Sequence, residues 1–454
     1  MKNIFILLLS MLLVIACTDL DQVPPNFASS DSLTEYETVL FAAYGYHFDA
    51  VGPMAIFGDF RSDNCFFDET PFTDFDEFGS NALTSSQSND FFRPFYAALY
   101  KSILSSNSVI ANSTDATEVG EAKFLRALSY FKLVQVFGDV TVNLEAIPDV
   151  SDASVLVRTP KNDVYNNVII PDLQDAKAAL SSSSAADANG RATSNAAQAL
   201  LGKVYASMGN YTAAATELKA VIEAAPGAGI SLQDNFVDIF GVEDDLNAEI
   251  LFATQMSSTA AITSSNLDLF VNWYGGTNTK ADPIDNAPID ADLIAAFDAV
   301  ADDTLPGGDI RRAATIEGTI SVKYDLVSPG DHDWVELRLT DVVMLYAEAL
   351  NENGSSADEV LGLLDPIRTR AGLTALDPAT INTKDLVRQA ILDERRLEFA
   401  CEAQRWFDLV RFDAAQPGIL SAEMGTTVSS NYHVFPIPLS EVTSFDEIAQ
   451  NPGY

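Results

Sequence analysis

Basic residues are few in this sequence: Lys and Arg total 26 against 65 Asp and Glu, for a formal net charge of −39. A field of this sign repels phosphate backbones and anionic lipid head groups, which argues against nucleic-acid binding. Hydrophobic residues make up 47% of the 454-residue chain and charged residues 20%. That composition excludes global disorder and allows a large apolar core.

Cysteine and histidine are also scarce. The sequence contains three of each, namely Cys17, Cys65, Cys401, His47, His332 and His433. No CxxC or HExxH motif occurs, so the sequence predicts no metal site and no cofactor. Cys65 and Cys401 lie hundreds of residues apart, and the sequence leaves open whether they form a disulfide.

The motifs of common catalytic centres are absent or incomplete. Ser129 and Lys132 fit S-x-x-K, and Ser62 to Asn64 fit S-D-N, but the K-T-G motif that should accompany them is missing and their order is reversed. No G-x-S-x-G, P-loop or G-x-G-x-x-G sequence is present. With 65 carboxylates, pairs at helical spacing arise by chance, so no glycosidase acid and base can be nominated. We therefore expect no catalytic residues and no enzymatic activity.

The N-terminus carries the features of an export signal. An almost unbroken apolar run from Ile4 to Ile15 follows Lys2 and ends at Ala16-Cys17. The run is too short to span a bilayer comfortably. A small residue followed by cysteine at the end of such a run indicates a bacterial lipoprotein signal, with residues 1–16 removed and Cys17 lipidated. The alternative is a simple secretory signal with a chance cysteine.

Helical periodicity recurs along the rest of the chain. The run L-G-K-V-Y at 201–205 matches L-G-x-x-Y of the tetratricopeptide repeat, and Gly209, Ala214 and Pro226 fall at the offsets of that repeat. This predicts two antiparallel helices over 195–226, with Gly202 and Ala214 allowing close approach and a turn at Gly209. Further helices are predicted at 32–46, 95–111, 121–137, 339–350, 358–370 and from 384 onward.

These helices predict an all-α fold with minor β-structure. One helix pair cannot bury its own apolar face, so several tetratricopeptide-like pairs must stack into a scaffold, mainly 117–226 and 337–412, within a single domain over 17–454. Residues 47–95 and 227–336 show no sustained period and are predicted to be loop-rich. Binding sites concentrate on irregular segments held by a rigid scaffold, so the 227–336 insert is expected to bind the ligand.

Residues 393–411, D-E-R-R-L-E-F-A-C-E-A-Q-R-W-F-D-L-V-R, resemble the C-terminal signature of the SusD/RagB family of Bacteroidetes nutrient-uptake lipoproteins. Phe435 to Pro438 and Asn451 to Tyr454 resemble the ending of that family. Cys401 and Ala403-Gln404 replace a commoner aromatic-Glu-Gly run, which we expect to affect packing. The motif combines an apolar stripe with Arg and acidic residues at pairing distance along a helix, so we expect its role to be structural.

The resemblance implies a surface-exposed, glycan-binding lipoprotein, anchored in the outer membrane by its N-terminal lipid and facing the extracellular side. Such a protein captures oligosaccharides without cleaving them and delivers them to a partner SusC-like TonB-dependent transporter. Three alternatives remain: a lipid-anchored helical-repeat scaffold protein without a ligand, a peptide-binding homologue, and a lipid-anchored glycoside hydrolase.

Sugar recognition needs aromatic faces beside hydrogen-bonding side chains, and two stretches of the sequence provide both. The predicted ligand-binding residues are Asn64, Phe66, Phe67, Phe72 and Phe75 in the first stretch, and Asn272, Trp273, Tyr274 and Asn278 in the second. The alternative is that these rings pack on the scaffold, as Trp334 is expected to do. Lys280 is the one basic residue near Trp273, which favours a neutral glucan-like chain over an anionic glycan.

Overall fold

The computed structural model describes residues 36–68, 72–79, 83, 87–147, 153–243, 245–257, 269–277, 288–300, 309–327 and 330–454. The predicted signal peptide and the lipidation site at Cys17 lie outside these residues, as does Asn278. Across the described ranges, no helix has both the length and the apolar character needed to cross a membrane.

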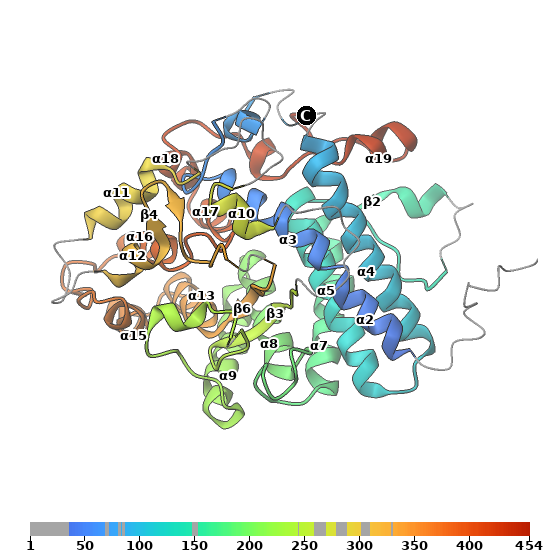
Figure 1. The fold of residues 1–454 in the computed structure, drawn as a ribbon, viewed down its shortest axis with the longest axis horizontal. Coiled ribbons are helices and arrows are strands. Elements are labelled where there is room, and N and C mark those ends of the chain that lie inside the picture. The colour runs from blue at the N-terminus through green and yellow to red at the C-terminus, as the bar shows by residue number, and fades with distance from the viewer. Residues whose placement is uncertain are drawn as a thin grey trace, which may run out of the picture.

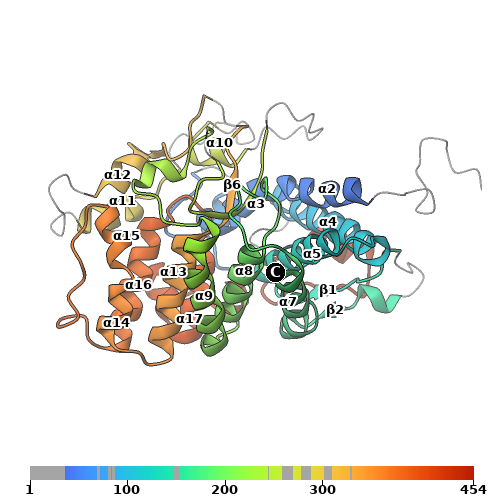
Figure 2. The same cartoon turned by 90° about the horizontal axis from the view of Figure 1, so that it is seen from below.

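Most of the described residues form α-helices, several of which stand side by side in a row across the molecule (Figure 2). In order, the row consists of α2 (Glu37–Gly45), α4 (Arg93–Asn112), α5 (Ala116–Phe137), α7 (Ile170–Ala179), α8 (Ser194–Ser207), α9 (Tyr211–Ala224), α13 (Leu339–Glu352) and α16 (Lys384–Glu398). Each helix packs against the next in this order. The predicted all-α fold with minor β-structure is thereby confirmed.

Shorter helices and strands surround this row. The helices are α3 (Phe48–Ala55), α6 (Lys161–Val164), α10 (Phe270–Tyr274), α11 (Ala291–Ala299), α12 (Ile310–Thr315), α14 (Ala357–Gly362), α15 (Asp365–Arg370), α17 (Arg405–Ala415), α18 (Ile419–Glu423) and α19 (Leu439–Ser444). The strands pair antiparallel as β1 (Val140–Thr141) with β2 (Arg158–Thr159), β3 (Ile250–Thr254) with β6 (Trp334–Arg338), and β4 (Ile316–Glu317) with β5 (Ile320–Ser321). Helices α10, α11 and α12 lie on one side of the row (Figure 2), with α10 beside α3 and α11 beside α16 (Figure 1).

The predicted tetratricopeptide-like pair is present as α8 and α9, which pack against each other. A Cβ atom on Gly202 would lie 2.6 Å from the side chain of Leu218, so glycine is needed for this close approach. Gly209 adopts φ +73° at the turn, as expected. Ala214 is buried, whereas Tyr205 is half-buried because it sits at the edge of the core.

Side-chain caps explain where several of these helices begin. The oxygen of a capping Asp, Thr, Asn or Ser accepts a hydrogen bond from a backbone N–H of the first turn, which would otherwise lack a partner. The caps are Asp115 for α5, Thr193 for α8, Asn210 for α9, Ser356 for α14 and Thr383 for α16. Polar residues thus determine where these helices begin, and the apolar faces of the helices determine how they pack.

Residues 48–60, predicted to be loop, form α3 and a π-helical continuation, Ile56–Phe60. In the sequence, Gly52, Pro53 and Gly58 indicate that a helix should break here. In the structure, this segment packs against α4 and buries Val51 and Phe57. Packing against the neighbouring helix overrides the local signal here.

The C-terminal helices follow the expected pattern with one break. The helix predicted at 358–370 is divided into α14 and α15 at Leu363 and Leu364, and Pro366 lies in the first turn of α15, where its missing N–H costs no helical hydrogen bond. Between α16 and α17 the chain turns through Cys401 and Ala403, which adopt φ +63° and +54°. Glycine is the residue that best tolerates this left-handed backbone, which explains the commoner glycine at the second of these positions in the resembled motif.

Candidate ligand-binding site

The structure places most of the predicted ligand-binding residues in the core. Trp273 and Tyr274 lie on α10 with only 2% and 1% of their surface exposed. Asn64, Phe67, Phe72 and Phe75 are also buried. The expected exposure of these aromatic side chains is therefore wrong, and their rings offer no face to a ligand in this structure.

The two predicted stretches do contact each other, but they do so through aromatic rings that pack together in the core. The ring of Trp273 lies 5.6 Å from that of Phe67 and 6.5 Å from that of Phe72, measured between centroids. The hydroxyl of Tyr274 donates to the buried carboxylate of Asp59 at 2.7 Å. Aromatic rings packed edge to face explain how a short stretch without helical period can be buried.

Other predicted residues have mixed positions. Phe66 and Asn272 are half-buried. Trp334 is 3% exposed and packs at 4.9 Å against Phe270, so the prediction that it is a structural anchor is confirmed.

A more open site lies where the end of α2 faces the end of β3. Two adjoining hollows, with volumes of about 460 and 680 Å³, are both lined by Gly45 and Gln255. We call this continuous hollow the α2–β3 groove. Its other lining residues are Phe41, Tyr44, His47, Leu125, Asn189, Gly190, Arg191, Phe252, Ala253 and Thr254 on the smaller side, and Phe48, Ala186, Val242, Glu243, Asp245, Leu246, Met256, Ser257 and Asp333 on the larger side.

An aromatic stripe lines the groove. Phe41, Tyr44 and Phe48 are spaced three and four residues apart along α2 and the start of α3, which places them on one face. Phe41 is 51% exposed, the largest exposed fraction of any aromatic ring among the exposed large hydrophobic residues that the structure describes. An exposed aromatic face beside a hollow is the surface on which a sugar ring can stack.

The polar side of the groove is held rigidly. Arg191 contacts Glu121 at 2.9 Å and Glu37 at 2.9 Å, and its guanidinium lies 5.4 Å from the ring of Phe41. Tyr44 donates its hydroxyl to Glu121 at 2.6 Å, and burial raises the pKa of Tyr44 well above its ordinary value. These contacts hold the arginine and both rings in place before any ligand arrives.

A tight loop brings Gln255 to the same place. Gly190 adopts φ +74°, and a Cβ atom there would lie 2.4 Å from the side-chain amide of Gln255. Asn189, its neighbour, also has a left-handed φ of +52°. Glycine therefore allows the loop to lie directly against an amide that can both donate and accept hydrogen bonds.

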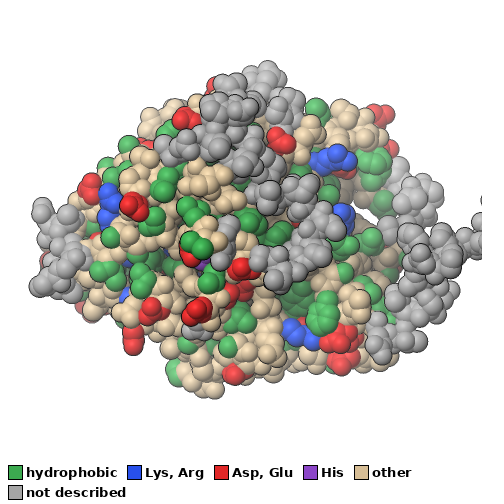
Figure 3. All heavy atoms as spheres, in the orientation of Figure 1, with side chains coloured by type: hydrophobic (Ala, Val, Ile, Leu, Met, Phe, Trp, Pro, Cys, Tyr) green, Lys and Arg blue, Asp and Glu red, His purple; other side chains and the backbone are tan. Residues whose placement is uncertain are grey.

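The larger side of the groove is acidic. Asp333 accepts a hydrogen bond from the backbone N–H of Met256 at 2.7 Å, yet burial raises its pKa to about 6. Glu243 and Asp245 line the same side. On the face shown in Figure 3, acidic side chains are scattered widely and basic ones are fewer. Carboxylates and amides suit hydroxyl groups, whereas an acidic surface disfavours anionic glycans.

His47 is a lining residue that the sequence reasoning missed. It is 2% exposed, its Nε2 lies 3.2 Å from the hydroxyl of Ser129, and its Nδ1 has no hydrogen-bond partner among the described residues. Ser129 donates its hydroxyl to the carbonyl oxygen of Leu125 at 2.8 Å.

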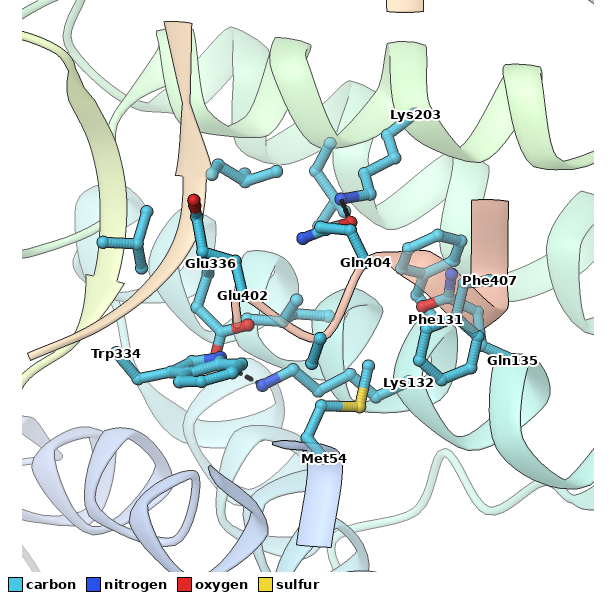
Figure 4. A pocket seen from close by; sticks show the side chains of 15 residues that line it. Met54, Phe131, Lys132, Gln135, Lys203, Trp334, Glu336, Glu402, Gln404 and Phe407 are labelled. Carbon is cyan, nitrogen blue, oxygen red and sulfur yellow. Dashed lines mark hydrogen bonds and ion pairs between the residues drawn. The ribbon is translucent and has the colours of Figure 1, made fainter. Parts of the chain in front are cut away.

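A separate internal cavity, with a volume of about 30 Å³, is lined by Lys132, Lys203, Glu336, Glu402 and Gln404 (Figure 4). Lys132 is paired with Glu336, and Lys203 contacts Gln404 at 3.0 Å. A space of this size holds about one water molecule. It is far too small for a sugar ring and is not the ligand site.

The charged residues of the C-terminal signature form a buried ion-pair network, but most of its pairs join distant segments and not residues one turn apart on the same helix. Arg395 pairs with Asp408 at 2.8 Å, and Glu398 contacts Arg338 at 2.9 Å and Arg311 at 3.1 Å. Burial alone would raise the pKa of Glu398, but the surrounding arginines lower it to about 2. These charges compensate one another inside the core, so the signature holds the fold together.

Comparison with known proteins places the chain in a family. It matches the family described as "SusD family" over residues 326–454, and the family described as "Starch-binding associating with outer membrane" over residues 26–206. It is similar to SusD-like protein P2 of Formosa agariphila, with 24% identity over 100% of this chain and 99% of that protein. The two family models and the curated SusD-like proteins together support the SusD/RagB family for this chain, and the family model over residues 26–206 is described as starch-binding and associating with the outer membrane.

Solved structures share the fold. A SusD superfamily protein from Parabacteroides distasonis aligns with a TM-score of 0.73 and 20% identity, covering 94% of this chain and 100% of that chain. A laminarin-binding SusD-like protein aligns with a TM-score of 0.66 and 23% identity, covering 93% of this chain and 99% of that chain. At these identities the likeness extends to the fold alone.

Proposed function

We propose that this protein captures oligosaccharides in the α2–β3 groove and delivers them to a SusC-like TonB-dependent transporter. In this proposal it is anchored in the outer membrane through a lipid on Cys17 and faces the extracellular side. It acts as a binding protein and cleaves no bond. The observation that carries the proposal is the exposed ring of Phe41, which flanks a hollow lined by fixed polar groups.

The chemistry of the groove favours a neutral glycan. Phe41, Tyr44 and Phe48 supply aromatic surface, and Asn189, Gln255, Asp245 and Asp333 supply hydrogen-bonding groups. Arg191 is already neutralised by Glu37 and Glu121, so it offers little net attraction for a uronate or a sulfate. A neutral glucan-like chain therefore fits best.

Affinity electrophoresis against laminarin, other neutral glucans and an anionic polysaccharide tests the proposal. Phe41→Ala removes the exposed ring and should weaken binding of the retarding glucan by about fivefold to tenfold, since one stacking contact contributes about 1 kcal/mol. Phe445→Ala is the matched control, because Phe445 is 38% exposed and does not line the groove.

Two outcomes contradict different parts of the proposal. If the wild type is retarded but Phe41→Ala and Gln255→Ala leave retardation unchanged, the ligand site lies outside the groove. If the wild type binds none of the polysaccharides while binding a peptide, glycan capture itself is refuted. Copurification of the lipoprotein with a TonB-dependent transporter tests the partner, and failure of the two to associate in outer-membrane extracts contradicts delivery.

A further inference from the structure

The segment that contains Cys65 is attached directly to the segment that contains Cys401. Ala403 donates its backbone N–H to Asp59 at 2.8 Å, and Arg396 donates to Asn64 at 3.1 Å and to the backbone carbonyl of Asp63 at 2.6 Å. Arg405 adds two hydrogen bonds to the Asp63 carboxylate, at 2.7 and 2.8 Å. These bonds join residues 332 to 344 positions apart in sequence; they involve residues just before Cys65 and residues on both sides of Cys401.

The backbones of the two segments also touch. A Cβ atom on Gly58 would lie 2.1 Å from the carbonyl oxygen of Ala403, so only glycine permits this approach. Tyr324 donates its hydroxyl to the carbonyl oxygen of Cys401 at 3.3 Å, and Cys65 forms a β-bridge with Ile289. The position of each cysteine is therefore set by several independent contacts.

Both cysteine side chains lie within these joined segments. Cys65 and Cys401 are fully buried, and both thiols are free in the structure. The pKa of Cys65 is raised, chiefly by burial and then by its contact with Cys401. The export signal predicted for the N-terminus would carry the two thiols into a compartment where disulfides form and persist.

We propose that Cys65 and Cys401 form a disulfide that fastens the segment after α3 to the C-terminal signature. The oxidant is a protein disulfide of the thiol–disulfide oxidoreductase class. One cysteine thiolate attacks that disulfide, forms a mixed disulfide and releases one thiol of the oxidant. The second cysteine then attacks the mixed disulfide and releases the other thiol, so two electrons and two protons pass from the cysteine pair to the oxidant.

Burial determines when this step occurs. Neither thiol is exposed in the folded protein, so an oxidant can reach the pair only before the two segments close on each other. Protein folded in a reducing compartment keeps both thiols free and protected, whereas protein folded during export carries the disulfide. The redox state of the pair thus records the compartment in which the chain folded.

Peptide mapping of the full-chain lipoprotein tests the proposal. Protein extracted from outer membranes is denatured in iodoacetamide and digested without reductant. We expect a linked peptide containing Cys65 and Cys401 that disappears on reduction. The same chain made in a reducing cytoplasm should show two alkylated cysteines, and these should be labelled only after denaturation. Mapping identifies the two cysteines directly, so Cys17 does not interfere.

Two controls make the result decisive. In Cys401→Ser the linked peptide is absent and Cys65 is alkylated after denaturation; Cys65→Ala provides the converse variant should the first fold poorly. The linked form should also unfold at a higher temperature than the same protein after reduction and refolding, since the disulfide closes a very long loop. Two alkylated cysteines in exported protein and again in protein refolded with oxidised glutathione would overturn the proposal.

Discussion

Asp63 and Arg405 form a bidentate ion pair in which Nε and Nη2 of the arginine lie 2.7 and 2.8 Å from the two carboxylate oxygens. Both side chains are buried, with 4% and 1% of their surface exposed. The pair joins the segment after α3 to the start of α17. Arg405 also contacts Glu423 at 2.6 Å, and Asp63 also contacts Arg396 at 2.9 Å, so loss of the Asp63 charge leaves two arginines with one partner fewer.

Asp63→Asn is therefore expected to lower the free energy of unfolding by about 1.5–3 kcal/mol, since charge-assisted hydrogen bonds are lost while Arg405 keeps its contact with Glu423. Urea unfolding followed by circular dichroism measures this change. Lys219→Met is the matched control, because the Lys219–Glu223 pair is exposed on both sides. The control should leave the unfolding midpoint unchanged, and equal effects of the two substitutions would contradict the argument.

Ala403→Gly should stabilise the protein by about 0.5–1 kcal/mol. Ala403 adopts φ +54°, a conformation that is unfavourable for a residue with a Cβ atom and natural for glycine. Ala199→Gly in the middle of α8 is the control and should destabilise by about 1 kcal/mol. Thermal unfolding of the two variants beside the wild type measures both signs, and a loss of stability in Ala403→Gly would show that strain at this turn is negligible.

The dependence of stability on pH should have two opposing components. Glu398 has a folded pKa of about 2 against an ordinary value of 4.5, so its contribution is complete above pH 4.5 and is lost as pH falls toward 2. Asp333 has a folded pKa of about 6 against 3.8. The folded state therefore binds more protons than the unfolded state between about pH 4 and 6, and the contribution of Asp333 falls as pH rises through that range.

Asp333→Asn isolates the second component. The amide oxygen can still accept the hydrogen bond from Met256, but the side chain no longer titrates. In this variant, the free energy of unfolding, measured in urea at a series of pH values, should fall less between about pH 4 and 6 than it does in the wild type. The loss of stability at lower pH, which Glu398 governs, should remain. An unchanged slope in this variant would assign that decline to another carboxylate, such as Asp59, whose pKa is also raised to about 6 by burial.

Cys17→Ser should release the protein from the outer membrane. The apolar run from Ile4 to Ile15, followed by Ala16, predicts lipidation at this cysteine, and a lipid anchor holds an otherwise water-compatible domain at the bilayer. Metabolic labelling with palmitate, followed by fractionation, measures the change. Partitioning of the variant with outer membranes at the wild-type level would refute anchoring through this residue.

The scaffold could be predicted because its signals are local. Gly202 and Gly209 lie at fixed offsets within one helix pair, and each has a steric reason that the structure bears out. Of the ion pairs in the signature, Arg411–Asp408 has the three-residue helical spacing that the sequence suggests, whereas the partners of Glu398 and Arg405 lie on distant segments. Residues 48–60 could not be predicted as helix, because the apolar surface that stabilises them belongs to α4.

The candidate site could not be predicted because exposure is not a local property. Trp273 has the same neighbours in sequence whether it faces solvent or the rings of Phe67 and Phe72, which lie some two hundred residues away. Phe41 has a periodic helical setting that suggests burial, yet half of its surface is exposed. For both aromatics, tertiary contacts between distant segments decide the outcome.

The contacts that join residues 59–64 to residues 396–405 also constrain the order of folding. Contacts so distant in sequence yield no stabilisation until the chain between them has been drawn together, so they form late and slow the reaction. The row from α4 to α9 can assemble earlier from neighbours in sequence. The segment after α3 is among the first to be synthesised, but it therefore reaches its final place only when α16 and α17 have emerged. A chain that loses its last helices would leave residues 59–64 without their native contacts.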